Sequence, residues 1–313
     1  MPLARTRFDK FKLRGLVAAT FTPFRADGSV NYPRIKPQIN QLIADGVAGL
    51  YVLGSTGEGP LLTTEERLKV AEASVKAAAG RVPVVVQVGH NSVVEASGFA
   101  AHAQAIGADA ISSTPASYFK PTSLDNLLDG VAEIAAAAPK LPFYYYNIPG
   151  LNGVRYDMEQ LLRRGGPRIP TLRGVKFSDT MLSELQACVE CDGGKYDIVF
   201  GCDEMLLSGL VVGVQGAVGS QYNFAAPHYR RIIAAYNRSD MAEARRLQFL
   251  AGELVRVIVA SHGGGRGGFK TVMKLIGQDC GPSRLPIATS TPAETARLRR
   301  DLTRFGFFKW GRR

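Results

Sequence analysis

The sequence predicts an α/β protein that consists of a closed (β/α)8 barrel and a C-terminal helical extension. Eight short runs rich in apolar and β-branched residues recur up to residue 220, and segments with helical periodicity separate them. Strands that are apolar on both faces and alternate with helices form parallel sheets. Eight such units within roughly 210 residues are typical of a closed TIM-type barrel rather than of an open, doubly wound sheet.

The expected strands are short and mostly apolar. In chain order they are residues 15–20, 48–53, 83–88, 109–114, 142–146, 172–177, 197–201 and 215–220. Helix signals lie between them. Two pairs have the spacing of a capping box, namely Thr63 with Glu66 and Ser92 with Glu95. Glycines at which helices are expected to end are Gly46, Gly80 and Gly107.

We divide the chain into a basic N-terminal arm (1–14), the barrel (15–224) and a C-terminal helical extension with a basic tail (225–313). Thr291-Pro292-x-Glu294 is expected to open the last helix. A Gly263-x-Gly265-x-x-Gly268 pattern in the extension matches a dinucleotide-binding fingerprint. It follows a predicted helix rather than a first strand, so no nucleotide site is expected there.

The net charge of +11 on 313 residues is concentrated at the two ends of the chain. Residues 1–14 carry +4 and residues 297–313 carry +6, which leaves +1 for residues 15–296. A protein that binds nucleic acid usually spreads Lys and Arg along a groove of the folded domain. Here the charge lies at the termini and the rest of the chain is nearly neutral. The basic side chains are therefore expected to be solvated, and no nucleic-acid partner is expected.

Composition and hydropathy patterning exclude several other classes of protein. The 46% apolar and 21% charged residues are those of a globular chain, not of a disordered or fibrous one. No apolar run approaches the roughly 20 residues of a membrane-spanning helix. The first residues also lack the apolar core of a secretory signal, so we expect a cytoplasmic protein without membrane contact.

The cysteines and histidines do not have the spacing of a metal site. Cys188-x-x-Cys191 falls in a predicted helix and has no second pair at zinc-finger spacing. Buried thiols of a reducing compartment are therefore favoured over a metal or redox site. The other Cys and His residues are scattered. We expect neither a metal nor an organic cofactor.

The active site of such a barrel lies at the carboxyl ends of its strands. The polar residues at these ends are Thr20, Ser55, Thr56, His90, Tyr146, Lys176, Asp203, Glu204 and Ser220. Lys176 lies in a strand expected to be buried on both sides, where desolvation favours the neutral amine. A neutral amine attacks carbonyls and forms Schiff bases. The alternative is a lysine whose ammonium reaches solvent at the strand end.

Other candidates accompany Lys176. In Gly54-Ser55-Thr56-Gly57-Glu58-Gly59 the glycines allow a tight turn whose amides can bind a carboxylate or a phosphate, although the GK[ST] end of a P-loop is absent. Tyr144 and Tyr146 are expected on one face of their strand and Tyr145 on the other. A Tyr146 hydroxyl near an imine could transfer protons, or the ring could simply pack against the helices. Asp203-Glu204 suits either acid–base chemistry or the start of a helix.

Five motifs in order, GSTGE, YNIP, GVKFSD, FGCDE and GAVGS, resemble the pyruvate-dependent class I aldolase family, which includes N-acetylneuraminate lyase and dihydrodipicolinate synthase. The resemblance runs from about Lys12 to Gly281. The segments PFYYYNIPGLNGV, LRGVKFSDT and GAVGSQYN are most similar to the N-acetylneuraminate lyases, particularly those of the animal type. The resemblance implies a homotetrameric Schiff-base aldolase that reversibly cleaves N-acetylneuraminate to N-acetylmannosamine and pyruvate.

The resemblance also implies a role for each candidate residue. Lys176 would form the imine with pyruvate or with the open-chain sialic acid, and Tyr146 would move protons to and from the aldol hydroxyl. Ser55 and Thr56, with nearby backbone amides, would hold the pyruvate carboxylate. The residues that would bind hydroxyls of the sugar are Ser178, Gly201, Asp203, Glu204 and Ser220.

The sequence departs from the family pattern at several positions. Leu151 stands where dihydrodipicolinate synthases typically carry an Arg, which makes that activity less favoured. Tyr118 is near the position of a tyrosine that family members can donate across a subunit interface, but the surrounding ASYFKP differs. Cys202 and Gln221 lie beside sugar-contacting positions, so the sugar can differ. The alternatives are another pyruvate-dependent aldolase or dehydratase acting on a 2-keto-3-deoxy sugar acid, and a barrel with a binding or regulatory role.

Overall fold

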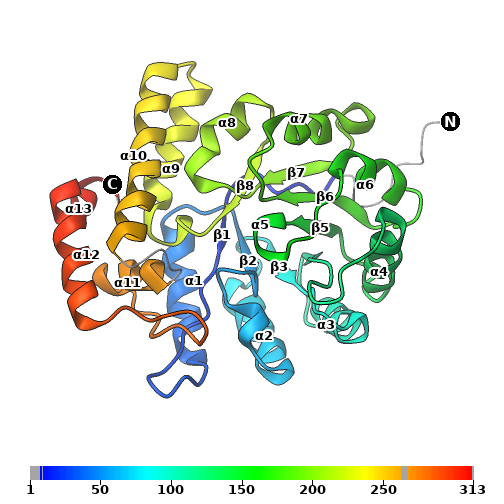
Figure 1. Cartoon of the computed structure of the whole chain (residues 1–313), viewed down its shortest axis with the longest axis horizontal. Coiled ribbons are helices and arrows are strands. Elements are labelled where there is room, and N and C mark those ends of the chain that lie inside the picture. Colours follow the sequence, from blue (N-terminus) through cyan, green and yellow to red (C-terminus); the bar gives the residue numbers. More distant parts are fainter. Residues whose placement is uncertain (1–7, 9, 262–266, 312–313) are drawn as a thin grey trace.

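The computed structural model describes residues 8, 10–261 and 267–311. Eight parallel strands form a closed barrel in which each strand pairs with its neighbours in sequence and β8 pairs with β1 (Figure 1). The strands are β1 (Gly15–Ala19), β2 (Gly49–Val52), β3 (Val84–Gln87), β4 (Ala110–Ser113), β5 (Phe143–Asn147), β6 (Leu172–Phe177), β7 (Asp197–Phe200) and β8 (Gly216–Gly219). All eight predicted strands are present, and the predicted (β/α)8 barrel is confirmed.

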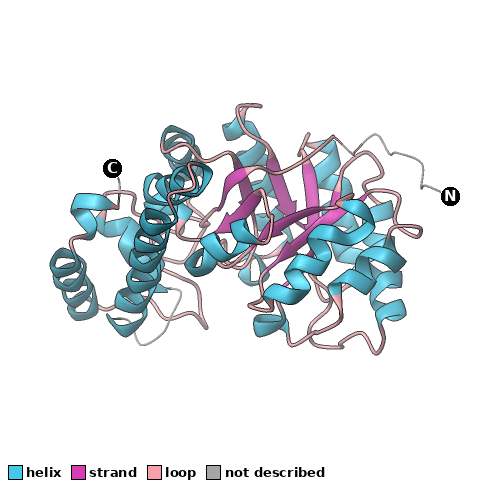
Figure 2. Cartoon of the chain, turned by 90° about the horizontal axis from the view of Figure 1, so that it is seen from above, coloured by secondary structure: helices cyan, strands magenta, loops and turns pink. Residues whose placement is uncertain are grey.

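Helices cover the barrel and continue beyond it. Those between the strands are α1 (Ile35–Ala44), α2 (Thr64–Ala78), α3 (Val93–Ala105), α4 (Leu124–Ala136), α5 (Pro149–Asn152), α6 (Met158–Gly165), α7 (Leu182–Glu190) and α8 (Leu206–Val211). After β8 come α9 (Tyr222–Asn237), α10 (Met241–Ser261), α11 (Gly267–Leu275), α12 (Pro292–Phe305) and α13 (Phe307–Trp310). The last helices stand together at one side of the barrel (Figure 2).

The helix α9 connects the barrel to this extension. It begins at Tyr222, so the boundary predicted between residues 224 and 225 falls inside it. The side-chain amide of Asn223 donates a hydrogen bond of 2.7 Å to the carbonyl of Ala19, the last residue of β1. The start of α9 is thus attached to the barrel, and the following helices pack on α9.

The helix signals of the sequence are present as local hydrogen bonds. Thr63 and Thr291 each form a complete capping box with the glutamate three residues on. The Ser92 hydroxyl accepts a hydrogen bond from the amide of Glu95. The predicted helix-ending glycines, which have positive φ, follow α1, α2 and α3: Gly46, Gly80 and Gly107.

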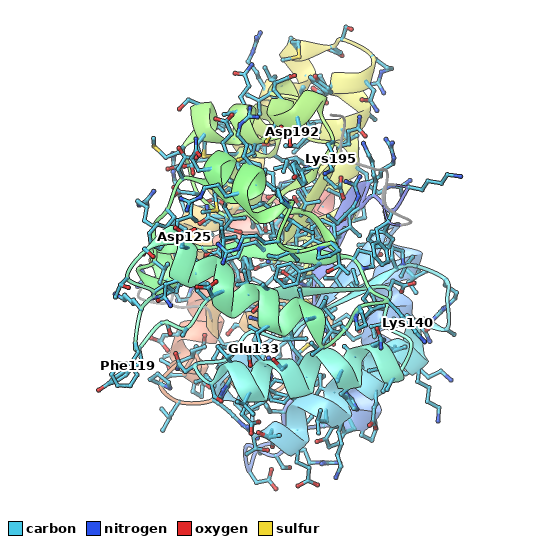
Figure 3. The ribbon with its side chains drawn as sticks, turned by 90° about the vertical axis from the view of Figure 1, so that its right-hand side faces the viewer. Phe119, Asp125, Glu133, Lys140, Asp192 and Lys195 are labelled. Carbon is cyan, nitrogen blue, oxygen red and sulfur yellow. The ribbon has the colours of Figure 1, made fainter. Side chains whose placement is uncertain are left out.

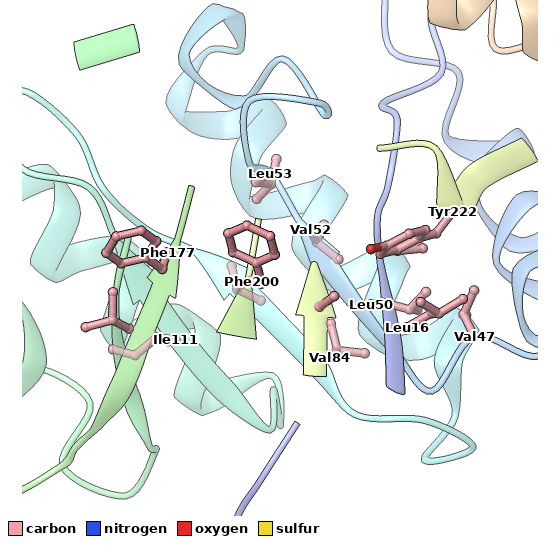
Figure 4. Packing of buried hydrophobic residues seen from close by; sticks show 14 of the residues in the cluster. Leu16, Val47, Leu50, Val52, Leu53, Val84, Ile111, Phe177, Phe200 and Tyr222 are labelled. Atoms are coloured by element: carbon pink, nitrogen blue, oxygen red, sulfur yellow. The ribbon is translucent and has the colours of Figure 1, made fainter. Parts of the chain in front are cut away.

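Two apolar layers stabilise the barrel. The outer layer lies between strands and helices and includes Leu16, Ile111 and Phe200 (Figure 4). The inner layer fills the barrel. Tyr144 and Tyr146 belong to the inner layer and Tyr145 to the outer one, as the alternation predicts.

The segment before β1 contacts the amino end of the barrel, opposite the predicted site. The amide of Leu13 and the hydroxyl of Tyr144 both donate to Oδ2 of Asp197, at 2.8 and 2.6 Å. Burial raises the pKa of this carboxyl above its ordinary value, although both hydrogen bonds oppose the shift. Leu13, in the predicted N-terminal arm, therefore forms part of the barrel core.

The basic termini are only partly described. Residues 1–7 and 9 of the predicted arm, with Arg312 and Arg313 of the tail, lie outside the described residues. The side chains of α12 exposed to solvent include Arg297, Arg299, Arg300 and Arg304. Asp301 on this helix lies 3.7 Å from Arg297 and 4.0 Å from Arg304.

The outer helices also carry opposite charges. Asp125 on α4 binds Arg164 and Arg168 from the α6 region (Figure 3).

Within residues 8, 10–261 and 267–311, no helix has both the length and the apolar character needed to span a bilayer.

Candidate active site

A cavity of about 150 Å³ opens at the carboxyl ends of the strands, where the sequence predicted the site. Seven of the nine predicted site residues line it: Ser55, Thr56, Tyr146, Lys176, Ser178, Gly201 and Ser220. Five different strands or the loops after them bring these side chains together. The cavity therefore depends on closure of the barrel and not on any single segment.

Lys176 lies near the end of β6, beside Tyr146 of β5 in the sheet register. Its side chain is only 4% exposed, and its Nζ atom lies 3.8 Å from the ring centres of both Tyr51 and Tyr146. The two aromatic faces favour a cation at this position, whereas burial favours the neutral amine. The observed burial excludes the alternative in which the lysine extends into bulk solvent.

Tyr146 connects Lys176 to the loop after β2. Its hydroxyl lies 3.4 Å from Oγ of Ser55, and its ring packs edge-on against Tyr51 with the centroids 5.6 Å apart. Tyr51 in turn donates a hydrogen bond of 3.0 Å from its hydroxyl to Oγ of Ser112. Both functional groups of Tyr146 are thus used: the ring faces the lysine and the hydroxyl faces the cavity.

The shape of the Gly54–Gly59 loop requires its glycines. A Cβ atom on Gly59 would lie 1.9 Å from the carbonyl oxygen of Leu53, and one on Gly54 would lie 2.7 Å from the Tyr51 ring. Leu53 and Glu58 have positive φ values of 64° and 55°, which non-glycine residues rarely adopt. Ser55 and Thr56 lie between these two residues, and the tight turn directs their hydroxyl side chains into the cavity.

The hydroxyls of the cavity meet across the barrel mouth. Oγ1 of Thr56 lies 2.6 Å from Oγ of Ser220, which follows β8. Oγ of Ser178 is buried and has no hydrogen-bond partner among the described residues. A Cβ atom on Gly201 would lie 1.9 Å from that oxygen, so only glycine leaves room for Ser178 at this point. Ser178 is therefore free to bind a ligand hydroxyl.

Asp203 and Glu204 are not among the residues that line the cavity. They open a short 3-10 helix (Asp203–Met205) that leads into α8, which is the alternative stated for them. Asp203 is turned inward, where Oδ2 accepts a hydrogen bond of 2.7 Å from the amide of Gln221. Burial raises the pKa of Asp203 to about 7. Glu204 is exposed.

Two other polar candidates at strand ends lie outside the cavity lining. Thr20 is buried, and Nδ1 of His90 accepts a hydrogen bond from the amide of Ser92 at the start of α3. Two residues at which the sequence departs from the family pattern are exposed, Tyr118 at 80% and Leu151 at 55%. Phe119 next to Tyr118 projects from the edge of the molecule (Figure 3).

Several lining residues were missed by the sequence analysis. Phe269 and Lys270 come from α11 in the extension, and Glu58 comes from the loop after β2. Glu58 stood inside a motif already singled out, so a search for charged residues in that loop could have found it. No local pattern distinguishes Lys270. Of the glycine pattern nearby, Gly263 and Gly265 lie outside the described residues, and Gly268 lies in α11.

The cysteines are buried or half-buried free thiols, as predicted. Burial raises the pKa of Cys191 to about 11 and that of Cys202 to about 12, so both stay protonated near neutral pH. Across residues 8, 10–261 and 267–311, no group of three or more His, Cys, Asp or Glu side chains is arranged to hold a metal ion.

Comparisons with known proteins agree with this fold. Residues 12–305 match the dihydrodipicolinate synthetase family. N-acetylneuraminate lyase A of Xenopus laevis is 40% identical over 282 residues, which is 89% of this chain and 92% of that protein. The structure of Proteus mirabilis N-acetylneuraminate lyase has a TM-score of 0.91 at 40% identity and covers 95% of this chain and 100% of its own.

A more distant structure, described as a catalytic lysine mutant of Ruminococcus gnavus sialic acid aldolase, has a TM-score of 0.89 at 27% identity. It covers 97% of this chain and 98% of its own. Fold and sequence identity agree along almost the whole length. The chain therefore belongs to the dihydrodipicolinate synthetase family.

Proposed function

We propose that this protein is a Schiff-base aldolase, a carbon–carbon lyase that reversibly cleaves N-acetylneuraminate to N-acetylmannosamine and pyruvate. The observation that carries the proposal is the position of Lys176. It lines the cavity together with several hydroxyl side chains, and its Nζ atom lies 3.8 Å from the centres of two tyrosine rings. The lyases that are about 40% identical over most of the chain support the choice of substrate.

In the first step Lys176 acts as the nucleophile. Its neutral amine adds to the C2 carbonyl of the open-chain keto acid, and the carbonyl oxygen leaves as water, so that a protonated imine remains. The hydroxyls of Ser55 and Thr56, with amides of the tight turn, hold the carboxylate next to this carbon. The two aromatic rings that face Nζ then stabilise the cation.

In the second step Tyr146 acts as the base. It takes the proton of the C4 hydroxyl while the C3–C4 bond breaks, so that C4 becomes the aldehyde of N-acetylmannosamine. The bond electrons move to the imine and form an enamine. C3 then takes up a proton, and water releases pyruvate and regenerates the lysine amine. The contact of 3.4 Å with Ser55 gives the Tyr146 proton a route within the site.

The sugar part of the substrate would extend over Ser178, Gly201 and Ser220. All three line the cavity, and the buried Ser178 hydroxyl lacks a partner among the described residues. Asp203 holds the amide of Gln221 next to Ser220, so we propose that it contributes by positioning that segment. We propose that Glu204 contacts only the end of a long substrate that extends out of the cavity.

Reduction with borohydride in the presence of pyruvate tests the chemistry. We expect a reduced pyruvyl group on Lys176, identified by peptide mass spectrometry, and loss of activity. A folded protein whose lysine stays unmodified would contradict every aldolase assignment and would favour a barrel with a binding or regulatory role. Formation of sialic acid from pyruvate and N-acetylmannosamine then tests the substrate.

A second candidate is an aldolase or dehydratase acting on another 2-keto-3-deoxy sugar acid. The observation that favours this candidate is that Asp203 and Glu204 do not line the cavity. The resemblance to N-acetylneuraminate lyases implies that both residues bind hydroxyls of the sugar. Turnover of such an acid without condensation of N-acetylmannosamine would establish it. Dihydrodipicolinate synthase activity is the least favoured, because Leu151 stands in place of the expected Arg.

We further propose that the chain forms a homotetramer in the cytoplasm. The exposed Tyr118 and Phe119 pair, whose rings pack edge-on, would lie between subunits. The free thiols fit a reducing compartment. Sedimentation should give four times the 33.7 kDa of one chain. A monomer at micromolar concentration would contradict the assembly without affecting the chemistry.

A further inference from the structure

A buried ion pair joins the Gly54–Gly59 loop to the C-terminal extension. Oε1 of Glu58 lies 2.7 Å from Nζ of Lys270, and the two side chains are 4% and 3% exposed. Both residues line the cavity, yet their charged groups are engaged by the protein. The other oxygen of Glu58 accepts from the amide of Arg284 at 2.8 Å, and Nζ of Lys270 also donates to the carbonyl of Pro282 at 2.9 Å.

The same part of the extension also holds the loop after β1. Nζ of Lys270 and the guanidinium of Arg284 lie 4.2 and 4.6 Å from the centre of the Phe24 ring. The amide of Phe24 donates to the carbonyl of Cys280 at 2.9 Å. Arg284 further donates to both oxygens of Glu66, at 2.5 and 2.6 Å, at the start of α2. The segment 270–284 of the extension thus contacts the loop after β1, Glu58 and the start of α2.

The loop needs such support because its backbone is unfavourable. The positive φ values of Leu53 and Glu58 persist only where the surrounding contacts impose them. Ser55 and Thr56 lie between these two residues. A displacement of Glu58 would therefore move both hydroxyls that face the cavity.

We propose that Glu58 and Lys270 are positioning residues, and that their ion pair holds the loop so that Ser55 and Thr56 bind the carboxylate of the keto acid. The inference rests on the proposed function, because it assigns a role within the same site. The extension is then part of the catalytic unit. Lys270 does not itself bind the substrate carboxylate, since its donors are directed to Glu58 and Pro282 and the Phe24 ring faces it.

The test uses the full chain and the rate of borohydride inactivation at increasing pyruvate. Glu58→Gln or Lys270→Met alone leaves one buried charge unpaired and should reduce stability, whereas the double variant removes both charges and should fold. In the double variant we expect the half-saturating pyruvate concentration to rise at least tenfold, with the maximal rate changed less than threefold. Lys274→Met, one turn along α11 and outside the catalytic cavity, is the matched control and should stay within twofold.

A folded double variant whose half-saturation stays within twofold of the wild type would overturn the inference. Lys270→Arg provides a second measurement that does not depend on the double variant. It keeps the charge and its half-saturating pyruvate concentration should stay within threefold of the wild type, and a rise of tenfold or more would also overturn the inference. A wild-type protein that is not labelled at all would instead contradict the proposed function.

Discussion

The Nζ atom of Lys176 lies 3.8 Å from the centre of the Tyr51 ring, inside the barrel. The Tyr51 ring is held by its own hydrogen bond to Ser112 and by the space that Gly54 leaves beside it. A cation at Nζ is attracted by this aromatic face, which offsets part of the cost of burial. The same attraction applies to a protonated imine.

Replacement of Tyr51 should separate the effect of its ring from that of its hydroxyl. A desolvated cation–π contact contributes about 2 kcal/mol, so Tyr51→Leu should lower the equilibrium constant for imine formation by roughly 30-fold. Tyr51→Phe keeps the aromatic face and should stay within about threefold. The fraction of protein trapped by borohydride at a fixed pyruvate concentration measures both. Equal losses in the two variants would exclude the cation–π contribution.

Lys176→Ala should abolish activity and leave folding intact. Removal of the amine eliminates the only step that attaches the substrate, and it also removes a buried polar group, so stability should change little. Steady-state turnover, near-UV circular dichroism and thermal unfolding check these outcomes. Turnover above roughly a thousandth of the wild-type rate in a folded Lys176→Ala protein would show that another residue carries the reaction.

Tyr146→Phe should slow bond cleavage more than imine formation. Loss of a general base typically costs about 10²- to 10⁴-fold in rate, whereas the phenyl ring still faces Lys176. Single-turnover cleavage and borohydride trapping give the two rates separately. Tyr144→Phe is the control, because it loses the hydrogen bond to Asp197 at the other end of the barrel and should affect stability without changing either rate. Unchanged cleavage in Tyr146→Phe would remove the proposed role as base.

Asp203 should make stability depend on pH. Its pKa is raised to about 7 from an ordinary value of 3.8. Between about pH 4 and 7 the folded state keeps a proton that the unfolded state has released, so the free energy of unfolding decreases as the pH rises. Asp203→Asn removes this titration. Its free energy of unfolding relative to that of the wild type should therefore rise by about 4 kcal/mol between pH 4 and pH 8. Urea unfolding at both pH values measures the difference, and a difference independent of pH would contradict the assignment.

Replacement of Gly98 and of Gly59 by alanine should change the stability of the protein in opposite directions. Gly98 lies on the exposed side of α3, and no atom would come within 4 Å of an added Cβ atom, so Gly98→Ala should stabilise the protein by about 0.5–1 kcal/mol. Gly59→Ala would place a Cβ atom 1.9 Å from the Leu53 carbonyl oxygen. We expect lower stability and weaker pyruvate binding, measured by thermal unfolding and pyruvate-dependent trapping. A Gly59→Ala protein with wild-type binding would show that the turn can relax.

The strands and the inward face of the barrel could be predicted because they follow from local patterns. A strand buried on both sides must be apolar along its length, and alternation of side chains then places Tyr144 and Tyr146 together. Polar residues at the ends of such strands, Lys176 among them, must meet at one mouth when the barrel closes. The resemblance of five ordered motifs added roles to these positions.

Local sequence was thus sufficient for the barrel, for the end at which the site lies and for the lysine at its centre, since each depends on periodicity or on order along the chain. Three contacts follow only from long-range packing: Glu58 pairs with Lys270, Tyr51 faces Lys176, and Asp203 accepts a hydrogen bond from the amide of Gln221. These contacts join segments far apart in sequence. They depend on how the extension packs against the loops and on which buried polar groups find partners, and neither property is encoded in a local pattern.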